Sequence, residues 1–499
     1  MNRALKRLSL AVLVMFLLLL ININYLQGFE ANSLAGKPGN SRAFYAQYQN
    51  QRGDIVTSDG VVIAESKPSP KGDSIPWQRY YPLPDIYAPV TGYDTLYSQT
   101  GLEQYESSTL NGSSSSLDVH NFIDLITGKK SQGATVVTTI NSAAQQAAYN
   151  GLVSILKGTG RRGGVVAIDP STGAILAMAS YPSYDPNLLA VQNGNQLNAN
   201  DEKLQQEQPS PLLNHAINDT FPPGSTFKIV TSSAYFNANP SSTVQTKLYS
   251  PTTLTLPQTS NTLINDDNEV CGDGSGQVPL LKAFAQSCDT TFGKIGLNVG
   301  GDALKTEAES FGFNSSNLSI PMPVSASQYV APVSGSPLVA YSAIGQYDDT
   351  ASPLQEAMLA AAIANGGRLM TPYLVKSVRA SDLSTISTTQ PAELNQAVSP
   401  TIANNIGQMM EAVVQQPEGT GYDYNQGAVG VNIAGKTGTA QNGVSNGNTS
   451  DAVFTCFAPY GNPKIAVGVI IQGGGYGATA AAPIAVQVIK AYLKTLGIG

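Results

Sequence analysis

The sequence predicts a mixed α+β protein that carries one membrane-spanning segment near its amino terminus. Three observations support this class. The chain opens with a basic and then strongly apolar segment, continues with short strand-like runs, and alternates strands with alanine-rich helical stretches over its last two thirds. The ranges with the clearest patterns are 8–23 (apolar), 165–179 (two strands), 353–365 and 401–414 (helices), 451–457 and 465–471 (strands), and 483–496 (helix).

The amino-terminal segment has the pattern of a signal anchor. Arg3, Lys6 and Arg7 precede an apolar run that extends from residue 8 to residue 29, which is within the ~17–25 residues needed to cross a bilayer. The alternative is a cleaved signal peptide, but no small-residue cleavage site follows the apolar run. The positive-inside rule then predicts a cytoplasmic tail (1–7), a transmembrane anchor (8–29) and an external remainder at the cell membrane.

Residues 30–160 predict a small, irregular, β-rich domain that follows a polar stalk. Short apolar runs at 54–57 and 60–64 are separated by turn signals such as Asp59-Gly60. A helix is expected over 141–157, with Asn141 as its polar cap. The glycine-rich joint at 158–164 then leads into the second domain, 161–499, which begins with a β-hairpin around the turn at 169–173.

Composition excludes several functions. Among 499 residues there are 27 Lys+Arg and 34 Asp+Glu, a net charge of −7, which argues against nucleic-acid binding. Only two His and three Cys are present, so a zinc site built from His and Cys is not expected. We expect no metal and no cofactor.

The strongest chemical signal is Ser225-Thr-Phe-Lys228, which follows the stiff Pro222-Pro-Gly turn. The residues after it predict a buried helix, with Ser225 in its first turn and Lys228 on the same face. A serine hydroxyl needs an adjacent base to become a nucleophile, and burial favours the neutral, basic form of a lysine. A second S-x-x-K, Ser154–Lys157, lies near a glycine-rich helix end and is interpreted as structural.

Two other matches to short motifs lack the context that their chemistry requires. The G-x-G-x-x-G at 158–163 precedes a strand instead of following one, so a dinucleotide site is not expected. The G-x-S-x-G at 443–447 lies in a polar loop without a strand-turn-helix pattern, so it is not a nucleophile elbow.

Two further motifs accompany Ser225 and Lys228. Ser287-Cys-Asp289 follows an apolar helical run, and Lys436-Thr-Gly-Thr439 reads as an inward strand with a buried lysine. The order S-x-x-K, S-x-[ND], K-T-G is that of the active-site-serine penicillin-recognising enzymes.

The chain resembles the class B penicillin-binding proteins over nearly its whole length, and most of all the short actinobacterial members of the PbpA type. The resemblance implies a non-catalytic pedestal domain followed by a penicillin-binding transpeptidase domain, in which helices flank an antiparallel sheet and a second subdomain is all-helical. Besides the three motifs, it is carried by Arg52-Gly-Asp-Ile55, Arg79-Tyr-Tyr-Pro82, Gly92-Tyr93, Gly101-Leu-Glu103, Val166–Met178, Pro182–Asn187, Asn214-His-Ala216, Gly345-Gln346 and Pro353-Leu-Gln355.

The resemblance implies a peptidoglycan D,D-transpeptidase that acts on stem peptides ending in D-Ala-D-Ala and is acylated by β-lactams as covalent inhibitors. Ser225 is the implied nucleophile and Lys228 its base. The other implied roles are a proton relay for Ser287, orientation by Asp289, pairing of Lys436 with Ser287, and substrate binding by Thr437, Gly438 and Thr439. The family usually has Asn at the position of Asp289, and a carboxylate there tends to keep Lys228 protonated.

The resemblance also implies that the pedestal contacts a polytopic glycan polymerase, against the alternative of a plain spacer. Two other functions stay open at this level. One is a D,D-carboxypeptidase or β-lactamase-like hydrolase of the same fold. The other is a non-catalytic β-lactam sensor or scaffold, although a scaffold is expected to have lost Ser225 or Lys228, and both are present.

Cys271 and Cys288 form the expected disulfide, because an external location permits it. The two cysteines are 17 positions apart, and closing a loop of that length lowers the entropy of the unfolded chain by an amount worth about 3 kcal/mol of stability. Since Cys288 lies between Ser287 and Asp289, the bridge would also hold the second motif. Cys456 is expected to be a buried free thiol.

Overall fold

The computed structural model of the chain describes residues 3–28, 48, 50–70, 75–117, 132–422, 430–441 and 450–498. The expected stalk at 31–40 and the loop at 443–447 lie outside the described residues.

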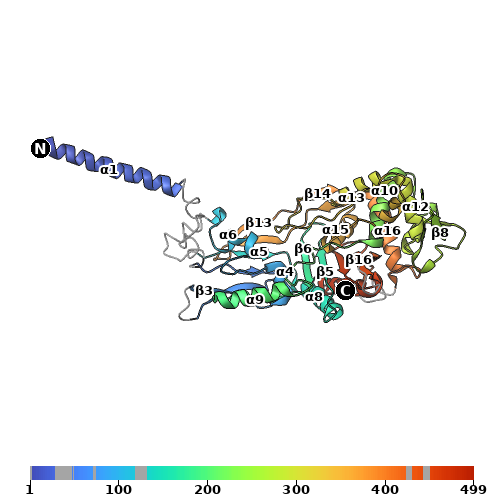
Figure 1. Cartoon of the computed structure of the whole chain (residues 1–499), viewed down its shortest axis with the longest axis horizontal. Helices are drawn as coiled ribbons and strands as arrows, with labels where there is room; N and C mark the ends of the chain where they lie inside the picture. The colour runs from blue at the N-terminus through green and yellow to red at the C-terminus, as the bar shows by residue number, and fades with distance from the viewer. Residues whose placement is uncertain are drawn as a thin grey trace.

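The amino-terminal helix α1 (Arg3–Gly28) is separate from the globular part of the molecule (Figure 1). Its stretch Leu5–Leu26 is long and apolar enough to cross a bilayer, and no part of its most apolar window is buried within the protein. An apolar helix with no protein cover fits a single-pass membrane anchor.

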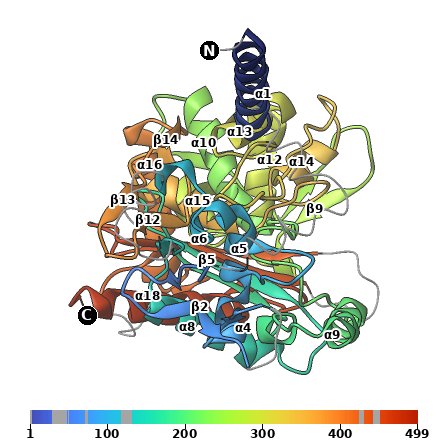
Figure 2. The same cartoon turned by 90° about the vertical axis from the view of Figure 1, so that its left-hand side faces the viewer.

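The centre of the molecule is a five-stranded antiparallel sheet in the order β15-β16-β17-β5-β6. Nearly all its residues are buried, because helices cover both faces: α8 and α18 lie on one side, α15 and α16 on the other (Figure 2). The strands are β5 (Gly163–Ile168), β6 (Ile175–Tyr181), β15 (Ala434–Ala440), β16 (Asp451–Ala458) and β17 (Ile465–Ile471), and the helices are α8 (Ser142–Leu156), α15 (Pro353–Ala364), α16 (Pro400–Gln415) and α18 (Ala482–Thr495).

Local sequence explains these elements well. The Asn141 side chain caps α8 by accepting a hydrogen bond from the amide of Ala144, and Ser352 caps α15 in the same way through Gln355. Gly468 lets α15 lie directly on β17, because a Cβ there would come within 2.4 Å of the backbone of Pro353 and Ala357. The expected hairpin, helices and strands of the second domain are therefore confirmed to within a few residues.

A helical region packs beside this sheet, at the end of the globular part away from the amino-terminal sheet (Figure 1). Its helices are α10 (Lys228–Ala238), α11 (Leu280–Ala285), α12 (Asp289–Val299), α13 (Gly301–Ser310) and α14 (Leu338–Ser342). It also carries two short antiparallel pairs, which are β7 (Lys247–Tyr249) with β10 (Gln277–Pro279) and β8 (Thr253–Thr255) with β9 (Thr262–Ile264).

The amino-terminal sheet has six strands in the order β13-β12-β4-β1-β2-β3. Two of its strands come from late in the chain, because β12 pairs antiparallel with β4. The strands are β1 (Ile55–Val56), β2 (Val62–Pro68), β3 (Trp77–Tyr80), β4 (Thr135–Thr138), β12 (Val375–Arg379) and β13 (Thr385–Thr388), and the short helices beside them are α4 (Pro84–Thr91), α5 (Gly101–Tyr105) and α6 (Ser107–Leu110).

Remaining elements are α9 (Gly194–Gln206), α17 (Gly477–Ala480) and a β11 (Arg368–Met370) to β14 (Glu393–Gln396) pair.

A buried ion cluster explains the Arg52-Gly-Asp-Ile motif. Glu103 is fully buried and accepts hydrogen bonds from Arg52 Nε at 2.6 Å and Arg79 Nε at 2.5 Å. Burial acts to raise the pKa of Glu103, but the two guanidinium groups outweigh it and hold that pKa below its usual value. Gly53 leaves room for this arrangement, since a Cβ there would lie 2.0 Å from the carbonyl oxygen of Ala134.

Candidate active site

Ser225 lies on a 3-10 turn, Gly224–Phe227, that runs directly into α10. The expected α-helical first turn is therefore wrong in detail: the α-helix begins at Lys228. The cause is Gly224, which has φ +57° and which packs so closely on β15 that a Cβ would lie 2.8 Å from the carbonyl oxygen of Thr439. The turn still places Ser225 and Lys228 on one face.

Lys228 contacts Ser225, Ser287 and Asp289 through its side-chain amine. Its Nζ lies 2.9 Å from Ser225 Oγ, 2.6 Å from Asp289 Oδ1, 2.7 Å from the carbonyl oxygen of Ser287 and 3.0 Å from Ser287 Oγ. The side chain is fully buried, and burial lowers its pKa although Asp289 acts in the opposite direction. Asp289 Oδ1 and the Ser287 carbonyl can only accept, so a neutral Lys228 can give them its two protons and turn its lone pair to Ser225.

Ser287 sits between α11 and α12 in a left-handed backbone conformation, with φ +60°. This conformation is uncommon for a residue with a side chain. It brings Ser287 Oγ between two lysines, 3.0 Å from Lys228 Nζ and 2.9 Å from Lys436 Nζ. The next residue, Cys288, forms a disulfide with Cys271, so the expected pair is bonded and holds this segment to the 262–271 wall of the cleft.

Lys436 projects from β15 and is fully buried. Besides Ser287 Oγ it donates to the carbonyl oxygen of Thr437 at 3.0 Å. Burial lowers its pKa well below the usual value, and the neighbouring Lys228 lowers it further, while Asp289 opposes the shift. Gly438 allows β15 to approach the nucleophile turn, because a Cβ there would lie 2.7 Å from the carbonyl oxygen of Pro223.

The five residues expected to be catalytic thus come together at one end of a cleft of about 1060 Å³. Ser225, Ser287, Asp289, Thr437 and Thr439 line it. Gly438 is not among the lining residues and serves the close packing of β15 instead.

Several residues of the cleft carried no signal in the sequence. Thr420, in the loop after α16, lies with its Oγ1 2.5 Å from Thr437 Oγ1 and lines the same cleft. Asn265 accepts hydrogen bonds from the amide (2.9 Å) and hydroxyl (3.2 Å) of Thr290 and so fastens the cleft wall to the start of α12. Tyr476, which follows three consecutive glycines (473–475), also lines it. Isolated polar residues in loops give no spacing pattern from which such contacts could be predicted.

His215 lies outside the cleft lining. Its ring contacts Asp219 at 2.9 Å and the carbonyl oxygen of Ser210 at 3.1 Å, and Asp219 also pairs with Arg162. These contacts make His215 a packing and hydrogen-bonding residue. Ser154 Oγ bonds the carbonyl oxygen of Gly151 within α8, as a structural residue does.

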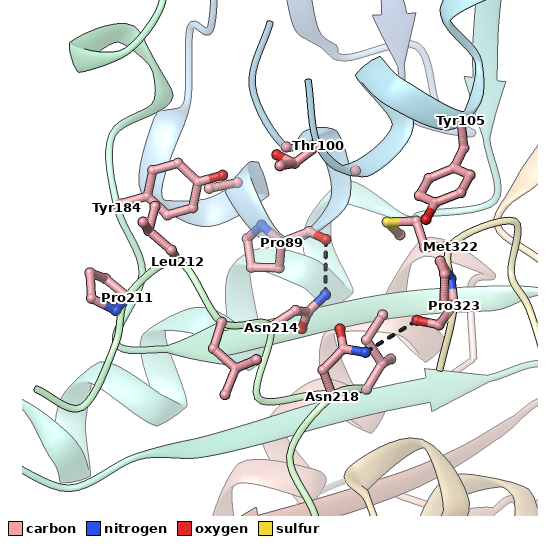
Figure 3. A pocket seen from close by; sticks show the side chains of 15 residues that line it. Pro89, Thr100, Tyr105, Tyr184, Pro211, Leu212, Asn214, Asn218, Met322 and Pro323 are labelled. Atoms are coloured by element: carbon pink, nitrogen blue, oxygen red, sulfur yellow. Dashed lines mark hydrogen bonds between the residues drawn. The ribbon is translucent and has the colours of Figure 1, made fainter. Parts of the chain in front are cut away.

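A second, smaller cavity of about 290 Å³ lies between α4 and the segment that leads to the nucleophile (Figure 3). Two asparagines of that segment fasten it to other parts of the chain: Asn214 Nδ2 donates to the carbonyl oxygen of Pro89 at 3.0 Å, and Asn218 Nδ2 to that of Pro323 at 3.2 Å (Figure 3). This cavity contains none of the expected catalytic residues.

Within the described part of the chain, no group of three or more His, Cys, Asp or Glu side chains could hold a metal ion. The groups gathered at Ser225 are a serine hydroxyl, two buried lysines, a bridging hydroxyl and one carboxylate.

Comparison with known proteins gives matches over nearly the whole chain. Residues 163–490 match the model of the penicillin-binding protein transpeptidase domain, and residues 52–136 match that of the penicillin-binding protein A dimerisation domain. The chain is 42% identical to the peptidoglycan D,D-transpeptidase PbpA of Mycolicibacterium smegmatis, and 40% identical to that of Mycobacterium tuberculosis, with 99% of each chain covered in both cases.

Solved structures of a related protein share the fold of this chain. The ceftriaxone acyl-enzyme complex of M. tuberculosis penicillin-binding protein A superposes with a TM-score of 0.84 at 39% identity, covering 90% of this chain and 99% of that one. The imipenem acyl-enzyme complex of the same protein gives a TM-score of 0.83 at 40% identity, covering 90% of this chain and 100% of that one.

Proposed function

The chain belongs to the penicillin-binding protein transpeptidase family, and on this premise we propose that it cross-links peptidoglycan as a D,D-transpeptidase through an acyl-enzyme on Ser225. The observation that carries the proposal is the contact of one buried amine, Lys228 Nζ, with Ser225 Oγ at 2.9 Å and Ser287 Oγ at 3.0 Å. This places a base, a nucleophile and a proton relay within hydrogen-bond reach.

Acylation begins with neutral Lys228. It takes the proton of Ser225 while Ser225 Oγ attacks the carbonyl carbon of the penultimate D-Ala of a stem peptide. The negative charge that develops on the carbonyl oxygen is received by the backbone N–H groups of Ser225 and Thr439. Removing one such donor costs about 3–4 kcal/mol of transition-state stabilisation in other acyl-transfer enzymes.

Collapse of the tetrahedral intermediate breaks the C–N bond to the terminal D-Ala. The leaving nitrogen needs a proton, and Ser287 Oγ–H supplies it. Ser287 is reprotonated by Lys228, which carries the proton taken from Ser225 and lies 3.0 Å away. The proton count therefore closes within three side chains. Asp289 orients Lys228, to which it is bonded at 2.6 Å.

The terminal carboxylate of the donor peptide binds at β15. The hydroxyls of Thr437 and Thr439 line the cleft there, and Lys436 lies buried behind them on the same strand, where its charged form would attract the carboxylate. The amine of a second stem peptide then attacks the acyl carbon, and the neutral Lys228 accepts its proton. The bond from the acyl carbon to Ser225 Oγ breaks, Lys228 returns the proton to Ser225 Oγ, and a new amide bond remains. A β-lactam mimics the donor terminus and acylates Ser225. Because the amine released by ring opening stays attached to the rest of the adduct, it does not depart, and the adduct persists.

The test uses the full chain in detergent. A β-lactam should add its intact mass once to the wild type and not to the Ser225→Ala variant. A donor peptide ending in D-Ala-D-Ala, supplied with an amine acceptor, should then yield cross-linked product together with free D-Ala. Release of D-Ala without cross-linking would favour the carboxypeptidase alternative, and rapid β-lactam turnover the β-lactamase-like one. An absent adduct would contradict the proposal.

The organisation along the chain is part of the same proposal. Residues 1–7 lie in the cytoplasm and 8–29 cross the membrane. Residues 30–160 supply most of the pedestal, whose sheet is completed by residues 375–388, and residues 161–499 supply most of the external transpeptidase domain, on whose sheet α8 packs. The Cys271–Cys288 disulfide supports the external placement, because such bonds persist in oxidising compartments. Protease added to intact spheroplasts should remove the catalytic part, and protection of that part would overturn this topology.

A polytopic glycan polymerase is the proposed partner of residues 30–160. The alternative is that these residues only set the distance of the site from the membrane. A contact with the polymerase could also be made inside the membrane by α1. Exchanging α1 for an unrelated single span, with residues 30–499 unchanged, removes that contact and leaves only one made by the pedestal. If the pedestal makes the contact, the exchanged chain should still co-purify with the polymerase, and charge reversals on exposed pedestal residues should abolish co-purification.

A further inference from the structure

Glu356 is a buried carboxyl group directly beneath the nucleophile turn. It lies in the first turns of α15, and its side chain is fully buried. Its Oε1 lies 2.9 Å from Thr226 Oγ1, and Thr226 is the neighbour of Ser225. The same Thr226 Oγ1 lies 2.9 Å from the carbonyl oxygen of Pro223, at the start of the turn. Hydrogen-bonding atoms therefore connect α15 to Thr226 and, through Thr226, to Pro223 on the other side of Gly224.

The protons in this line can be counted. Thr226 has a single O–H proton, whereas both the Pro223 carbonyl and an ionised Glu356 can only accept. The two contacts of Thr226 Oγ1, each at 2.9 Å, can therefore both be hydrogen bonds only if the glutamate carries a proton. A charged Glu356 would compete with Pro223 for the Thr226 proton, and its Oε2, which is buried and has no hydrogen-bond partner, would remain unsatisfied.

Among the residues that the structure describes, no Lys, Arg or His pairs with Glu356, and the nearby Lys228 is paired with Asp289 instead. Among the described residues packed against α15, strands β5 and β17 carry no titratable group, and β16 carries only Asp451 at its start and the buried thiol of Cys456. On α16 the titratable group is Glu411, and on β11 it is Arg368. None of these contributes to the ionisation of Glu356: burial raises its pKa to about 8, and the bond to Thr226 opposes the shift.

We propose that Glu356 is a positioning residue, held as a neutral carboxylic acid, whose O–H donates to Thr226 and thereby fixes the turn that aims Ser225. This inference rests on the proposed function, because the turn matters only if Ser225 is the nucleophile. The relay is Glu356 O–H to Thr226 Oγ1, then Thr226 O–H to Pro223 O. Loss of the glutamate proton reverses the first bond, takes the Thr226 proton away from Pro223, and frees the turn.

Ahead of the turn, the backbone of Phe221 is anchored by an antiparallel bridge to Ala351. Pro222 and Pro223 have no N–H to donate, and Gly224 has no side chain, so the Pro223 carbonyl is a main point at which the turn can be held. The amide of Gly224 is fixed separately, by donating to the carbonyl oxygen of Gly345 at 2.9 Å. A change at Glu356 is therefore expected to alter the aim of Ser225 without removing any group that touches the substrate.

Three variants of the full chain in detergent test this: Glu356→Gln, Glu356→Leu and Thr226→Val. The rate constant for acylation by a fluorescent penicillin is measured from pH 6 to pH 10. We expect the wild-type rate to fall above about pH 8, where Glu356 ionises. The Gln variant donates through its amide, so it should keep the neutral-pH rate within about threefold and lose the alkaline fall. Leu and Val should each lower the rate about tenfold. A fourth variant that combines Glu356→Leu with Thr226→Val should lower it no further.

A second readout does not depend on acylation. A carboxyl whose folded pKa is raised destabilises the folded state as pH rises from its unfolded value to its folded value, here up to about 8. The melting temperature of the wild type should therefore fall over this range relative to that of Glu356→Gln. Parallel melting curves, or an unchanged alkaline fall in the Gln variant, would overturn the proposal. A wild type that melts as expected but is never acylated would overturn the proposed function alone.

Discussion

Lys436 Nζ lies 2.9 Å from Ser287 Oγ, although 149 positions separate the two residues. A second buried amine, Lys228 Nζ, approaches the same oxygen at 3.0 Å from the other motif. Two charged ammonium groups so close together and out of water repel each other, and burial with this repulsion lowers the pKa of Lys436. The two lysines are therefore expected to titrate as a pair around one hydroxyl, with a proton to share.

The first prediction concerns the acid limb of the pH profile. Lys228 must be neutral to accept the Ser225 proton, and burial lowers its pKa. As pH falls through that pKa the lysine becomes charged, and the acylation rate should fall about tenfold per pH unit. Stopped-flow acylation by a chromogenic β-lactam measures this limb. A rate that does not change between pH 5 and pH 8 would exclude Lys228 as the base.

The second prediction concerns Asp289→Asn. The carboxylate at 2.6 Å from Lys228 Nζ favours the charged lysine. Removing its charge should lower the pKa of Lys228 further and move the acid limb to lower pH. The rate at neutral pH should be retained, because an amide oxygen still accepts the Lys228 proton. Lys228→Ala is the matched control and should lose acylation at every pH; a limb that stays in place in the Asn variant would refute the assignment.

The third prediction concerns the disulfide. Removing Cys271–Cys288 frees a loop whose closure constrains the unfolded chain, so the variant Cys271→Ser/Cys288→Ser should lose about 3 kcal/mol of stability. Acylation should also slow, because Cys288 adjoins Ser287. Denaturant unfolding with and without reductant measures the first effect. The double variant keeps the buried free thiol of Cys456 but has no disulfide. It serves as the control, because reductant should no longer change its stability.

The fourth prediction concerns Gly224→Ala. The alanine must adopt φ +57°, at a cost of about 1 kcal/mol, and its Cβ would lie 2.8 Å from the Thr439 carbonyl oxygen. The turn or β15 must then move, so acylation should fall at least about tenfold. Gly158→Ala is the matched control: its φ is +79° with no atom within 4 Å of the added Cβ, so it should show strain without loss of acylation.

Much of the catalytic part could be predicted from the sequence, because its elements are long and its motifs are local. The strand at 465–471 and the helix capped by Asn141 appear where the pattern placed them. The meeting of Ser225, Ser287 and Lys436 was predicted from motif order through a family resemblance, since no local rule relates residues so far apart in the chain.

The remainder depends on tertiary contacts. The 3-10 turn at Ser225 depends on the close packing of Gly224 against β15, a contact with a distant strand that the local pattern does not reveal. Glu356 stands in an alanine-rich helical pattern, where a glutamate is ordinarily read as exposed; its burial is decided by the packing of α15 on the sheet. Nothing in residues 375–388 indicates that they complete a sheet begun more than two hundred residues earlier.

The amino-terminal sheet cannot be separated from the rest of the chain by a single cut. Cutting at residue 160 would separate β4 from β12, leaving a bare strand edge on each piece, and such edges promote aggregation. It would also open the small apolar contact of Leu117 and Ala134 with Val378. The two regions are therefore not interchangeable modules: a chimaera that grafts the pedestal onto another transpeptidase must carry residues 375–388 with it.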